Sequence, residues 1–247
     1  MKISGIIIAK NAENQIADAI ESLKFCDEVI VVDNNSEDRT EDVAKRMGAL
    51  VFKVETNNFS KLRNFGKEKT EFEWVFYLDS DERVSDNLAK EIKEKIDKND
   101  EYVAYKILRK NFYLGKNEWP KIEKMERLFL KKNLMQWTGA LHETPQVDGK
   151  VGELSSYLMH YTHQDLNLML RKTIEWSDVE VKNRIEAKHP KMTWWRFPRV
   201  MISTFLSYYI KQRGFKLGTA GFVESLYQSY SSFITYAKLW EKQNKSN

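Results

Sequence analysis

The chain has 247 residues, enough for one large α/β domain or for a domain with a sizeable extension. Hydrophobic residues make up 42% and aromatic residues 13%, so the chain can bury a core and wholesale disorder is excluded. The single cysteine, Cys26, excludes an intramolecular disulfide and fits a reducing compartment. No apolar run approaches the roughly 18 residues of a membrane-spanning helix, and the amino terminus shows no signal-peptide pattern. We therefore expect a protein of the cytoplasm or of the cytoplasmic side of a membrane.

The net charge is +4, but the basic residues are unevenly distributed. From Ala187 to Val223 there are seven Lys or Arg residues and no Asp or Glu. This asymmetry predicts an anionic partner surface for the carboxyl-terminal part of the chain.

Strands and helices alternate regularly over the first eighty residues. Short apolar runs predict buried strands, and apolar residues three or four positions apart predict helices. The expected strands are 3–9, 29–32, 50–54 and 74–78, and the expected helices between them are 15–23, 40–47 and 60–69. This alternation is typical of a parallel sheet with right-handed crossovers.

The rest of the chain is less regular. We expect helices at 88–96 and 166–187, strands at 103–108 and 127–130, a loop around a further strand at 135–147, and a mainly helical tail over the last sixty residues. No internal repeat and no low-complexity segment is present.

Two carboxylates, Asp79 and Asp81, follow the strand 74–78 and are separated only by Ser80. A strand of this kind delivers them to the carboxyl edge of an α/β sheet, where such folds bind ligands. On an extended strand the two side chains would point the same way. Mg²⁺ and Mn²⁺ commonly take one or two carboxylates and complete their shell with phosphate and water. The alternative is an acidic loop that only caps the strand.

Other polar residues belong to the same edge of the predicted sheet. Asp33 follows the second strand, where a carboxylate can accept hydrogen bonds from a ribose hydroxyl or a base. Arg63 and Asn64 lie on the helix before the carboxylate strand; arginine recognises phosphate, and asparagine can orient a neighbouring carboxylate. Ser36, Asp38 and Thr40 are expected to cap the next helix.

Taken together, these motifs resemble family 2 glycosyltransferases. Four stretches carry the resemblance, in order: Ala9–Glu13, Val31–Thr40, Lys61–Gly66 and Leu78–Glu82. The resemblance implies a GT-A fold, an inverting mechanism and a nucleotide-sugar donor, most often a UDP-sugar. The fold class is therefore α/β: a GT-A-type, Rossmann-like nucleotide-sugar-binding domain with a mainly parallel central sheet and a helical carboxyl-terminal extension. The expected reaction needs Mg²⁺ or Mn²⁺.

The second half narrows the resemblance to the branch that contains lipopolysaccharide-core glucosyltransferases. The stretches Glu126–Phe129, Trp137–Glu143 and His160–Tyr161 carry it. It implies that Glu143 is the general base, with His142 as the next candidate, although a His-Glu pair could also be structural. His160 is either a packed core residue or part of the metal shell, and His163 is expected at the surface. The stretch 214–218 departs from this branch, because it has no acidic residue near its second glycine.

The resemblance assigns roles residue by residue. Glu143 is catalytic; Asp81, Asp79 and His160 are the metal ligands; and the donor-binding residues are Ala9, Asn11, Glu13, Asp33, Arg63, Asn64, Asp79, Ser80, Asp81 and Arg127. The expected domains are a catalytic domain over 1–163, with a nucleotide-binding half to about 98 and an acceptor half after it, and a membrane-associating extension over 164–247. The acceptor is expected to be a glycan or a lipid-linked molecule of the bacterial cell surface.

Two other functions remain open at this stage. A sugar-phosphate nucleotidyltransferase could use the same sheet and carboxylates, but it normally carries a glycine-rich loop after its first strand, and residues 10–14 contain no glycine. A non-catalytic membrane-binding module is the third possibility. The retained carboxylates Asp79, Asp81 and Glu143 argue against it.

The segment from about 190 to 216 combines aromatic, aliphatic and basic residues. Its apolar run, Val200–Ile210, is too short to cross a bilayer, whereas Trp, Tyr and basic side chains favour the lipid headgroup region. We therefore expect a helix that lies in the interface of an anionic membrane, and no nucleic-acid partner. The alternatives are a helix buried against the catalytic domain and a dimer contact. The expected location is the cytoplasm, with peripheral attachment to the inner face of the cell membrane.

Overall fold

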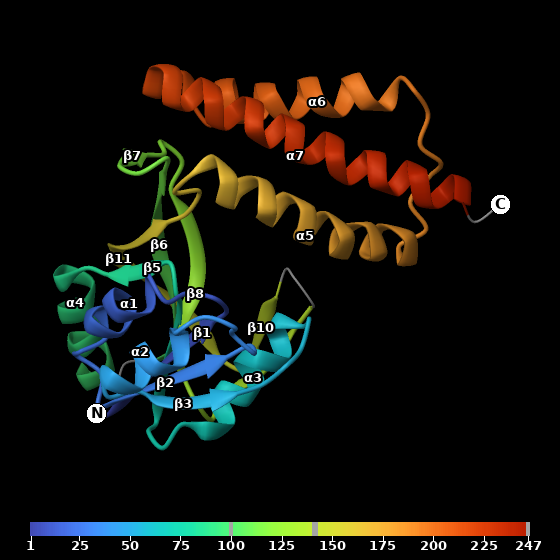
Figure 1. Ribbon diagram of the computed structural model, residues 1–247. Coiled ribbons are helices and arrows are strands. Elements are labelled where there is room, and N and C mark those ends of the chain that lie inside the picture. The colour runs from blue at the N-terminus through green and yellow to red at the C-terminus, as the bar shows by residue number, and fades with distance from the viewer. Residues whose placement is uncertain (99–100, 140–142, 246–247) are drawn as a thin grey trace. The chain divides into compact units, whose positions relative to one another are not determined.

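The structure is a computed structural model and describes residues 1–98, 101–139 and 143–245 (Figure 1). The alternative base His142 therefore lies outside the described residues. The chain forms two compact units. The first comprises Met1–Lys110 and Glu123–His160, and the second comprises Asn111–Ile122 and Tyr161–Asn247.

The first unit is an α/β domain, as the alternating pattern predicted. Its elements are β1 (Ile3–Ala9), α1 (Ile16–Ser22), β2 (Glu28–Asp33), α2 (Thr40–Arg46), β3 (Leu50–Lys53), α3 (Phe59–Lys69), β4 (Trp74–Asp79), β5 (Glu82–Val84), α4 (Asp86–Lys98), β6 (Tyr102–Tyr113), β8 (Glu123–Leu130), β9 (Leu134–Thr138), β10 (Thr144–Val147) and β11 (Lys150–Tyr161). Strands β6 and β11 continue past the end of this unit by a few residues.

The central sheet has the order β3-β2-β1-β4-β8-β6-β11-β5. Strands β3, β2, β1 and β4 are parallel and lie within residues 1–98, the half that we expect to bind the nucleotide. Strand β8 pairs antiparallel with β4 and β6, and β5 pairs antiparallel with β11, so the later strands extend the same sheet in the opposite sense. The expected α/β class with a parallel core sheet is confirmed.

Each face of the sheet has its own apolar core, because successive strand residues alternate between faces. Ile3, Ile7 and Val31 pack with the apolar sides of α1 and α4. Ile6, Ile8 and Val32 pack with Leu62 of α3 and with Trp137 of β9. The apolar spacing read from the sequence therefore places α3 and β9 on one face and α1 and α4 on the other.

The structure corrects the second half of this unit in two places. Residues 135–147, expected as a loop around one strand, form the antiparallel hairpin of β9 and β10. Residues 150–161 form the long strand β11, which the aromatic run around His160 did not reveal. All three strands carry exposed polar residues, so none shows the continuous apolar pattern of a central strand.

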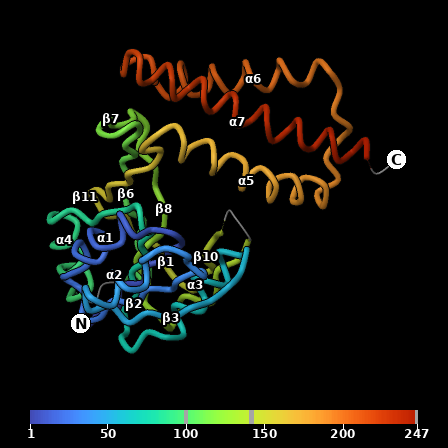
Figure 2. The backbone as a smooth tube through the Cα atoms, in the orientation of Figure 1, coloured from blue at the N-terminus to red at the C-terminus, as the bar shows by residue number. Residues whose placement is uncertain are grey.

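The second unit contains β7 (Asn117–Glu118) and a helical tail. The tail consists of α5 (Leu166–Glu186), α6 (Arg196–Leu206), the short π-helix η1 (Ser207–Lys211), the 3₁₀ turn η2 (Gly214–Leu217) and α7 (Gly218–Lys245). Helices α5 and α6 both pack against α7, as the backbone trace in Figure 2 shows. A bond from the Ser229 hydroxyl to the Met201 carbonyl, at 2.8 Å, joins α7 to α6.

His163 was expected at the surface, and this expectation is wrong. Its ring stacks on Tyr113 with centroids 5.1 Å apart, and its Nδ1 lies 2.9 Å from Oε1 of Glu224. Glu224 is completely buried, so a polar partner for its carboxylate has to come from within the unit. Because Glu224 lies 61 residues further along the chain, local sequence could not reveal the pair.

Candidate active site

The ends of three neighbouring strands bring the first candidate residues together. In the parallel sheet Ala9 lies opposite Asp33, and Ile8 lies opposite Asp79. The carboxyl ends of β1, β2 and β4 therefore meet at one edge of the sheet, which is where open α/β sheets bind ligands. The strand register therefore places Asp33 and Asp79 at this edge of the sheet, as we expected.

The loops after β1 and β2 are joined by hydrogen bonds between side chains and backbone. The backbone N–H of Asn11 donates to the Ser36 hydroxyl at 2.9 Å, and the N–H of Glu37 donates to the Asn11 side chain at 2.9 Å. The N–H of Glu13 donates to Asp38 at 3.0 Å. Asn11 has φ 48°, a left-handed conformation that asparagine tolerates better than most residues.

Thr40 also joins the loops that follow β1 and β2. Its hydroxyl accepts from the N–H of Ala12 at 2.7 Å, while its own N–H donates to Asp38 at 2.9 Å. Ser36, Asp38 and Thr40 therefore do more than cap the following helix, because they also hold the loop after β1 in place.

Asp33 is completely buried in this arrangement. Its carboxylate accepts from the N–H of Ser36 at 3.3 Å and from the hydroxyl of the same residue. Asp33 thus shapes the loop that follows β2.

Asp79 lies between two buried arginines. Its Oδ1 accepts from Arg63 at 2.9 Å, and its Oδ2 accepts from Arg127 at 2.7 Å. The arginine side chains are only 4% and 5% exposed, whereas that of Asp79 is 30% exposed. Burial would raise the pKa of Asp79, but the positive charges of Arg127 and Arg63 outweigh burial and hold that pKa well below its ordinary value.

The sequence analysis missed Glu82 and Arg109, which complete this cluster. Glu82 is completely buried; its Oε1 accepts from Arg127 and from Arg109, each at 2.8 Å, and its Oε2 accepts from the N–H of Asp79 at 3.0 Å. Burial would lower the pKa of Arg109, and the Glu82 charge raises it above its ordinary value. An acidic residue directly after Asp81 was visible in the sequence, but its arginine partners lie on distant strands.

Asp81 has a different environment from Asp79. Strand β4 ends at Asp79, and Ser80 and Asp81 form a turn before β5, so the expectation that both carboxylates point the same way along an extended strand is wrong. Asp81 Oδ2 lies 3.4 Å from Nε2 of His160. Strand β11 places His160 there by pairing it with Glu82. The Ser80 carbonyl accepts from Arg83 at 2.9 Å, which steadies the turn.

Asn64 holds β9, the strand that precedes Glu143. Its amide Nδ2 donates to the Trp137 carbonyl at 3.0 Å, and its Oδ1 accepts from the Trp137 N–H at 2.8 Å. The side chain thus pairs with β9 as a neighbouring strand would, and it does not orient a carboxylate as we expected. The reason is that β9 carries a free backbone edge on the side facing α3.

Glu143 directly precedes β10 and contacts Arg63. Its Oε1 lies 2.7 Å from the Arg63 guanidinium, which also holds Asp79. The guanidinium lies over the Trp137 ring at 4.9 Å and near the Tyr77 ring at 5.7 Å. One nitrogen of Arg63, Nη1, is buried without a hydrogen-bond partner among the described residues. Arg63 therefore joins two carboxylates that are 64 residues apart in the sequence.

Comparison with known proteins identifies the family of the chain. The model of the family described as "Glycosyl transferase family 2" matches residues 4–147, which is more than half of the chain. The chain belongs to glycosyl transferase family 2. An uncharacterized glycosyltransferase of Rickettsia typhi is 32% identical over 99% of this chain and 89% of its own length. The lipopolysaccharide core biosynthesis glycosyltransferase LpsC of Rhizobium meliloti is 24% identical over 98% of this chain and 93% of its own.

Solved structures of similar architecture include S. aureus TarS 1-349 in complex with UDP-GlcNAc. It has a TM-score of 0.49 and 14% identity, and the match covers all of this chain and 93% of TarS 1-349.

The family 2 resemblance implies a divalent metal ion, and the donor groups near Asp81 can be tested for it. No group of three or more His, Cys, Asp or Glu suited to a metal exists within the described residues. Asp81 and His160 together supply two ligands, and both oxygens of Asp79 already accept from arginine. Two protein ligands suit Mg²⁺ or Mn²⁺ when phosphate oxygens and water complete the shell. The residues present therefore fit such an ion.

Proposed function

We propose that this glycosyltransferase moves a hexose from a UDP-sugar to a glycan or lipid-linked acceptor, with inversion at the anomeric carbon. The observation that carries this proposal is the cluster of Asp79, Arg63 and Glu143 beside the Asp81–His160 pair. The matched family supplies the reaction class. The printed name of LpsC points to lipopolysaccharide or a related surface polysaccharide as the product class.

In the proposed reaction Glu143 acts as the general base. Arg63 contacts its Oε1, and the second oxygen accepts the proton of the acceptor hydroxyl as that hydroxyl attacks the anomeric carbon. The bond from that carbon to the diphosphate breaks at the same time, and the diphosphate leaves with the electron pair. The acceptor oxygen thus bonds to the anomeric carbon on the side opposite the departing diphosphate, which inverts the configuration of that carbon.

Asp79 is assigned a positioning role. By binding Arg63 and Arg127 it fixes two cations at the edge of the sheet where the donor diphosphate is expected. Asp81 and His160 would hold the divalent ion, which when bound neutralises negative charge on the departing diphosphate. The loops that carry Asn11, Glu13 and Asp33 would enclose the nucleoside end of the donor.

We also propose that the helical tail lies on an anionic membrane on the cytoplasmic side. Contacts between the tail helices use small hydroxyl residues, such as Ser229 and the Thr204–Ser232 pair. Ring pairs such as Phe197–Phe233 and Phe205–Phe222 also join α6 to α7, but α6 has no buried residue and many large apolar side chains remain exposed. Those at least 42% exposed on α6, η1 and α7 are Ile202, Leu206, Ile210, Phe222, Leu226, Tyr230 and Trp240.

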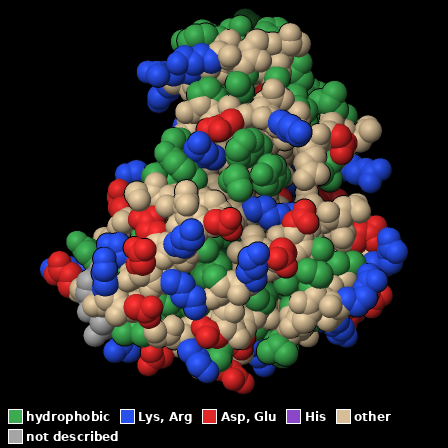
Figure 3. All heavy atoms as spheres, turned by 90° about the vertical axis from the view of Figure 1, so that its left-hand side faces the viewer, with side chains coloured by type: hydrophobic (Ala, Val, Ile, Leu, Met, Phe, Trp, Pro, Cys, Tyr) green, Lys and Arg blue, Asp and Glu red, His purple; other side chains and the backbone are tan. Residues whose placement is uncertain are grey.

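This outward apolar surface is consistent with lipid contact. Within the described residues no helix is both long and apolar enough to cross a bilayer. In Figure 3 hydrophobic side chains gather over the ends of α6 and α7, whereas acidic and basic side chains mix over the α/β unit. Basic residues with apolar and aromatic neighbours are typical of helices that lie in the membrane interface.

The proposal is tested by measuring transfer and donor binding with purified protein, Mn²⁺ and a panel of nucleotide-sugars that includes UDP-glucose. Glu143→Gln should bind donor as wild type does and lose transfer or slow donor hydrolysis by about a hundredfold to ten-thousandfold. Glu153→Gln, an equivalent change at an exposed ion pair with Lys124, should keep wild-type rates.

Four outcomes would contradict the proposal. Failure to bind any nucleotide-sugar would remove the donor assignment, and a Glu143→Gln variant within a few fold of wild type would move the base elsewhere. Pyrophosphate release from a nucleoside triphosphate and a sugar phosphate would favour the nucleotidyltransferase, and donor binding without turnover would favour a non-catalytic module.

A further inference from the structure

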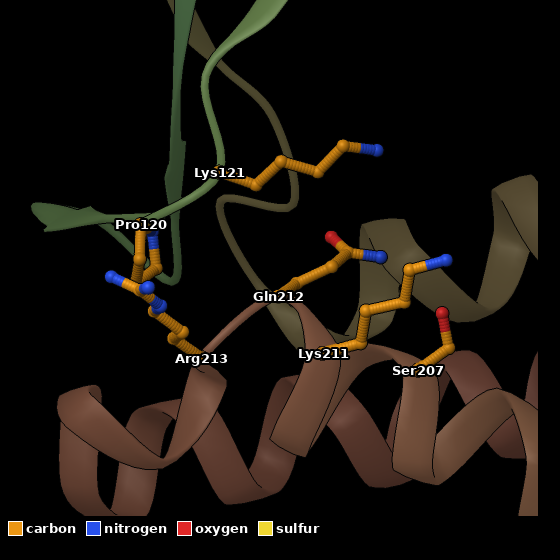
Figure 4. Close-up of a pocket in the computed structure, with 6 residues that line it drawn as sticks. All are labelled: Pro120, Lys121, Ser207, Lys211, Gln212 and Arg213. Carbon is orange, nitrogen blue, oxygen red and sulfur yellow. The ribbon is translucent and has the colours of Figure 1, made fainter.

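The second unit contains a hollow of about 340 Å³ that belongs to none of the sites described above. It is lined by Pro120, Lys121, Ser207, Lys211, Gln212 and Arg213 (Figure 4). Three of these residues are cationic and none is acidic. In the described part of the chain, Lys121, Lys211 and Arg213 form no ion pair. A concave site with uncompensated positive charge attracts anions.

The wall of the hollow is held by a buried tryptophan. Trp119 is only 1% exposed, and its indole Nε1 donates to Oε1 of Gln212 at 3.0 Å. Because an indole nitrogen can only donate, this bond fixes which way the Gln212 amide points. The amide oxygen faces Trp119, and the –NH₂ group remains as a donor. Figure 4 shows that nitrogen on the same side as the ends of Lys211, Lys121 and Ser207.

The turn that carries Arg213 is also fixed by its surroundings. Arg213 has φ 63° and ψ 29°, a left-handed conformation that a residue with a side chain rarely adopts. A Cβ on the next residue, Gly214, would lie 2.7 Å from the Trp119 ring and 2.9 Å from the Tyr208 carbonyl. A Cβ on Gly221 of α7 would lie 1.9 Å from the Gly214 carbonyl. Close packing on two sides therefore imposes the strained turn and keeps the hollow in shape.

We propose that this hollow binds a phosphate group. Its lining offers the ammonium groups of Lys121 and Lys211, the Gln212 amide and the Ser207 hydroxyl, all of which can donate to phosphate oxygens, whereas the Arg213 guanidinium lies beside Pro120 and adds positive charge (Figure 4). No acidic side chain lines it to repel an anion. The phosphate is borne either by a small soluble ester or by a lipid headgroup, since both present the same oxygens.

The NMR signal of the Trp119 indole N–H can report binding in this hollow, because this N–H donates to Gln212, which lines the hollow. In a ¹⁵N–¹H spectrum of the full chain its signal should move when inorganic phosphate is added at constant ionic strength. The other six tryptophans serve as internal references. Lys121→Gln combined with Lys211→Gln should weaken the apparent affinity at this signal at least fivefold. Lys182→Gln combined with Lys188→Gln removes the same charge from exposed positions outside the hollow and should leave the affinity unchanged.

The two sources of phosphate are separated by comparing glucose 6-phosphate with a short-chain phosphatidylglycerol used below its micelle concentration. Whichever ligand moves the Trp119 signal at the lower concentration identifies the source, and either order supports the site. An unmoved Trp119 signal with all three ligands would overturn the proposal. So would equal weakening by the control pair, because that result would show only general attraction to positive charge.

Discussion

At the scale of single residues, Asp79 shows how the same side chain type takes different roles two positions apart. Asp79 neutralises two buried guanidinium groups, whereas Asp81 faces His160 from a turn. Removing one partner of a buried ion pair leaves an uncompensated charge, which is far more costly than changing an exposed group. The two carboxylates should therefore differ in what their loss does to the fold.

The first residue-scale prediction concerns Asp79 and pH. Its pKa is depressed in the folded state, so the unfolded chain binds more protons on acidification. The stability that Asp79 contributes is present above about pH 4, the ordinary range of an aspartate, and is lost as the pH falls below it. Asp79→Asn should lower the free energy of unfolding at pH 7 by about 3 kcal/mol and flatten its decline below pH 5.

Urea unfolding measured between pH 3 and pH 7 tests this expectation. Asp81→Asn makes the same chemical change two residues away, outside the arginine cluster, and should lose transfer with a smaller loss of stability at pH 7. If Asp79→Asn were as stable as wild type at pH 7, Asp79 would not be balancing Arg63 and Arg127 in the way we describe.

At the scale of elements, side chains of α3 hold the β9–β10 hairpin: Lys67 donates to the Met135 carbonyl, and Arg63 contacts Glu143. Asn64 makes two hydrogen bonds to the Trp137 backbone, and β10 begins directly after Glu143. The hairpin itself pairs only four residues of β10, so its placement relies on such contacts. Disturbing Asn64 should consequently affect the position of the proposed base.

We predict that Asn64→Ala lowers the free energy of unfolding by about 2 kcal/mol, because two hydrogen bonds at a partly buried site are lost. Hydrogen exchange at 134–138 should become faster, and the transfer rate should fall with it. Asn87→Ala, on the exposed side of α4, is the matched control and should change neither quantity. Unchanged exchange at the Trp137 amide in Asn64→Ala would show that the hairpin is held by other contacts.

At the scale of the whole molecule, charge and apolar surface are divided between the two units. The tail between Ala187 and Val223 carries only positive charges, and its helices turn large apolar side chains outward. Neither property alone indicates a membrane, since exposed apolar residues are common on soluble proteins. Their combination on one pair of helices supports the interfacial proposal.

Purified protein should sediment with phosphatidylglycerol liposomes at low salt, and added salt should weaken this binding. Replacing Ile202, Leu206 and Ile210 by serine should release the protein, because these exposed side chains supply the apolar contact. Replacing Met47 and Leu50 by serine, which are 40% and 50% exposed on the α/β unit, should not. Wild-type protein that stays in the supernatant at low salt would contradict the proposal.

The sequence by itself determined the α/β order of the first unit, because apolar spacing alone distinguishes a buried strand from a helix with one buried face. Strand β1 and the start of α2 agree with the structure to the residue. It also determined the family, because motifs such as Leu78–Glu82 are recognised from their order in the sequence, without any knowledge of contacts. No local sequence pattern indicated which residues would pair with each charged side chain.

Only the tertiary structure decided those partners. Arg63, Arg109 and Arg127 meet Asp79, Glu82 and Glu143 through strands and helices that are distant along the chain. The hairpin and β11 were equally hidden, because strands with one polar side lack a continuous apolar signal. The stability of a buried charge depends on which opposite charge reaches it. Strand order and register decide which opposite charge lies next to a buried charge. A window of a few residues in the sequence does not encode that order or register.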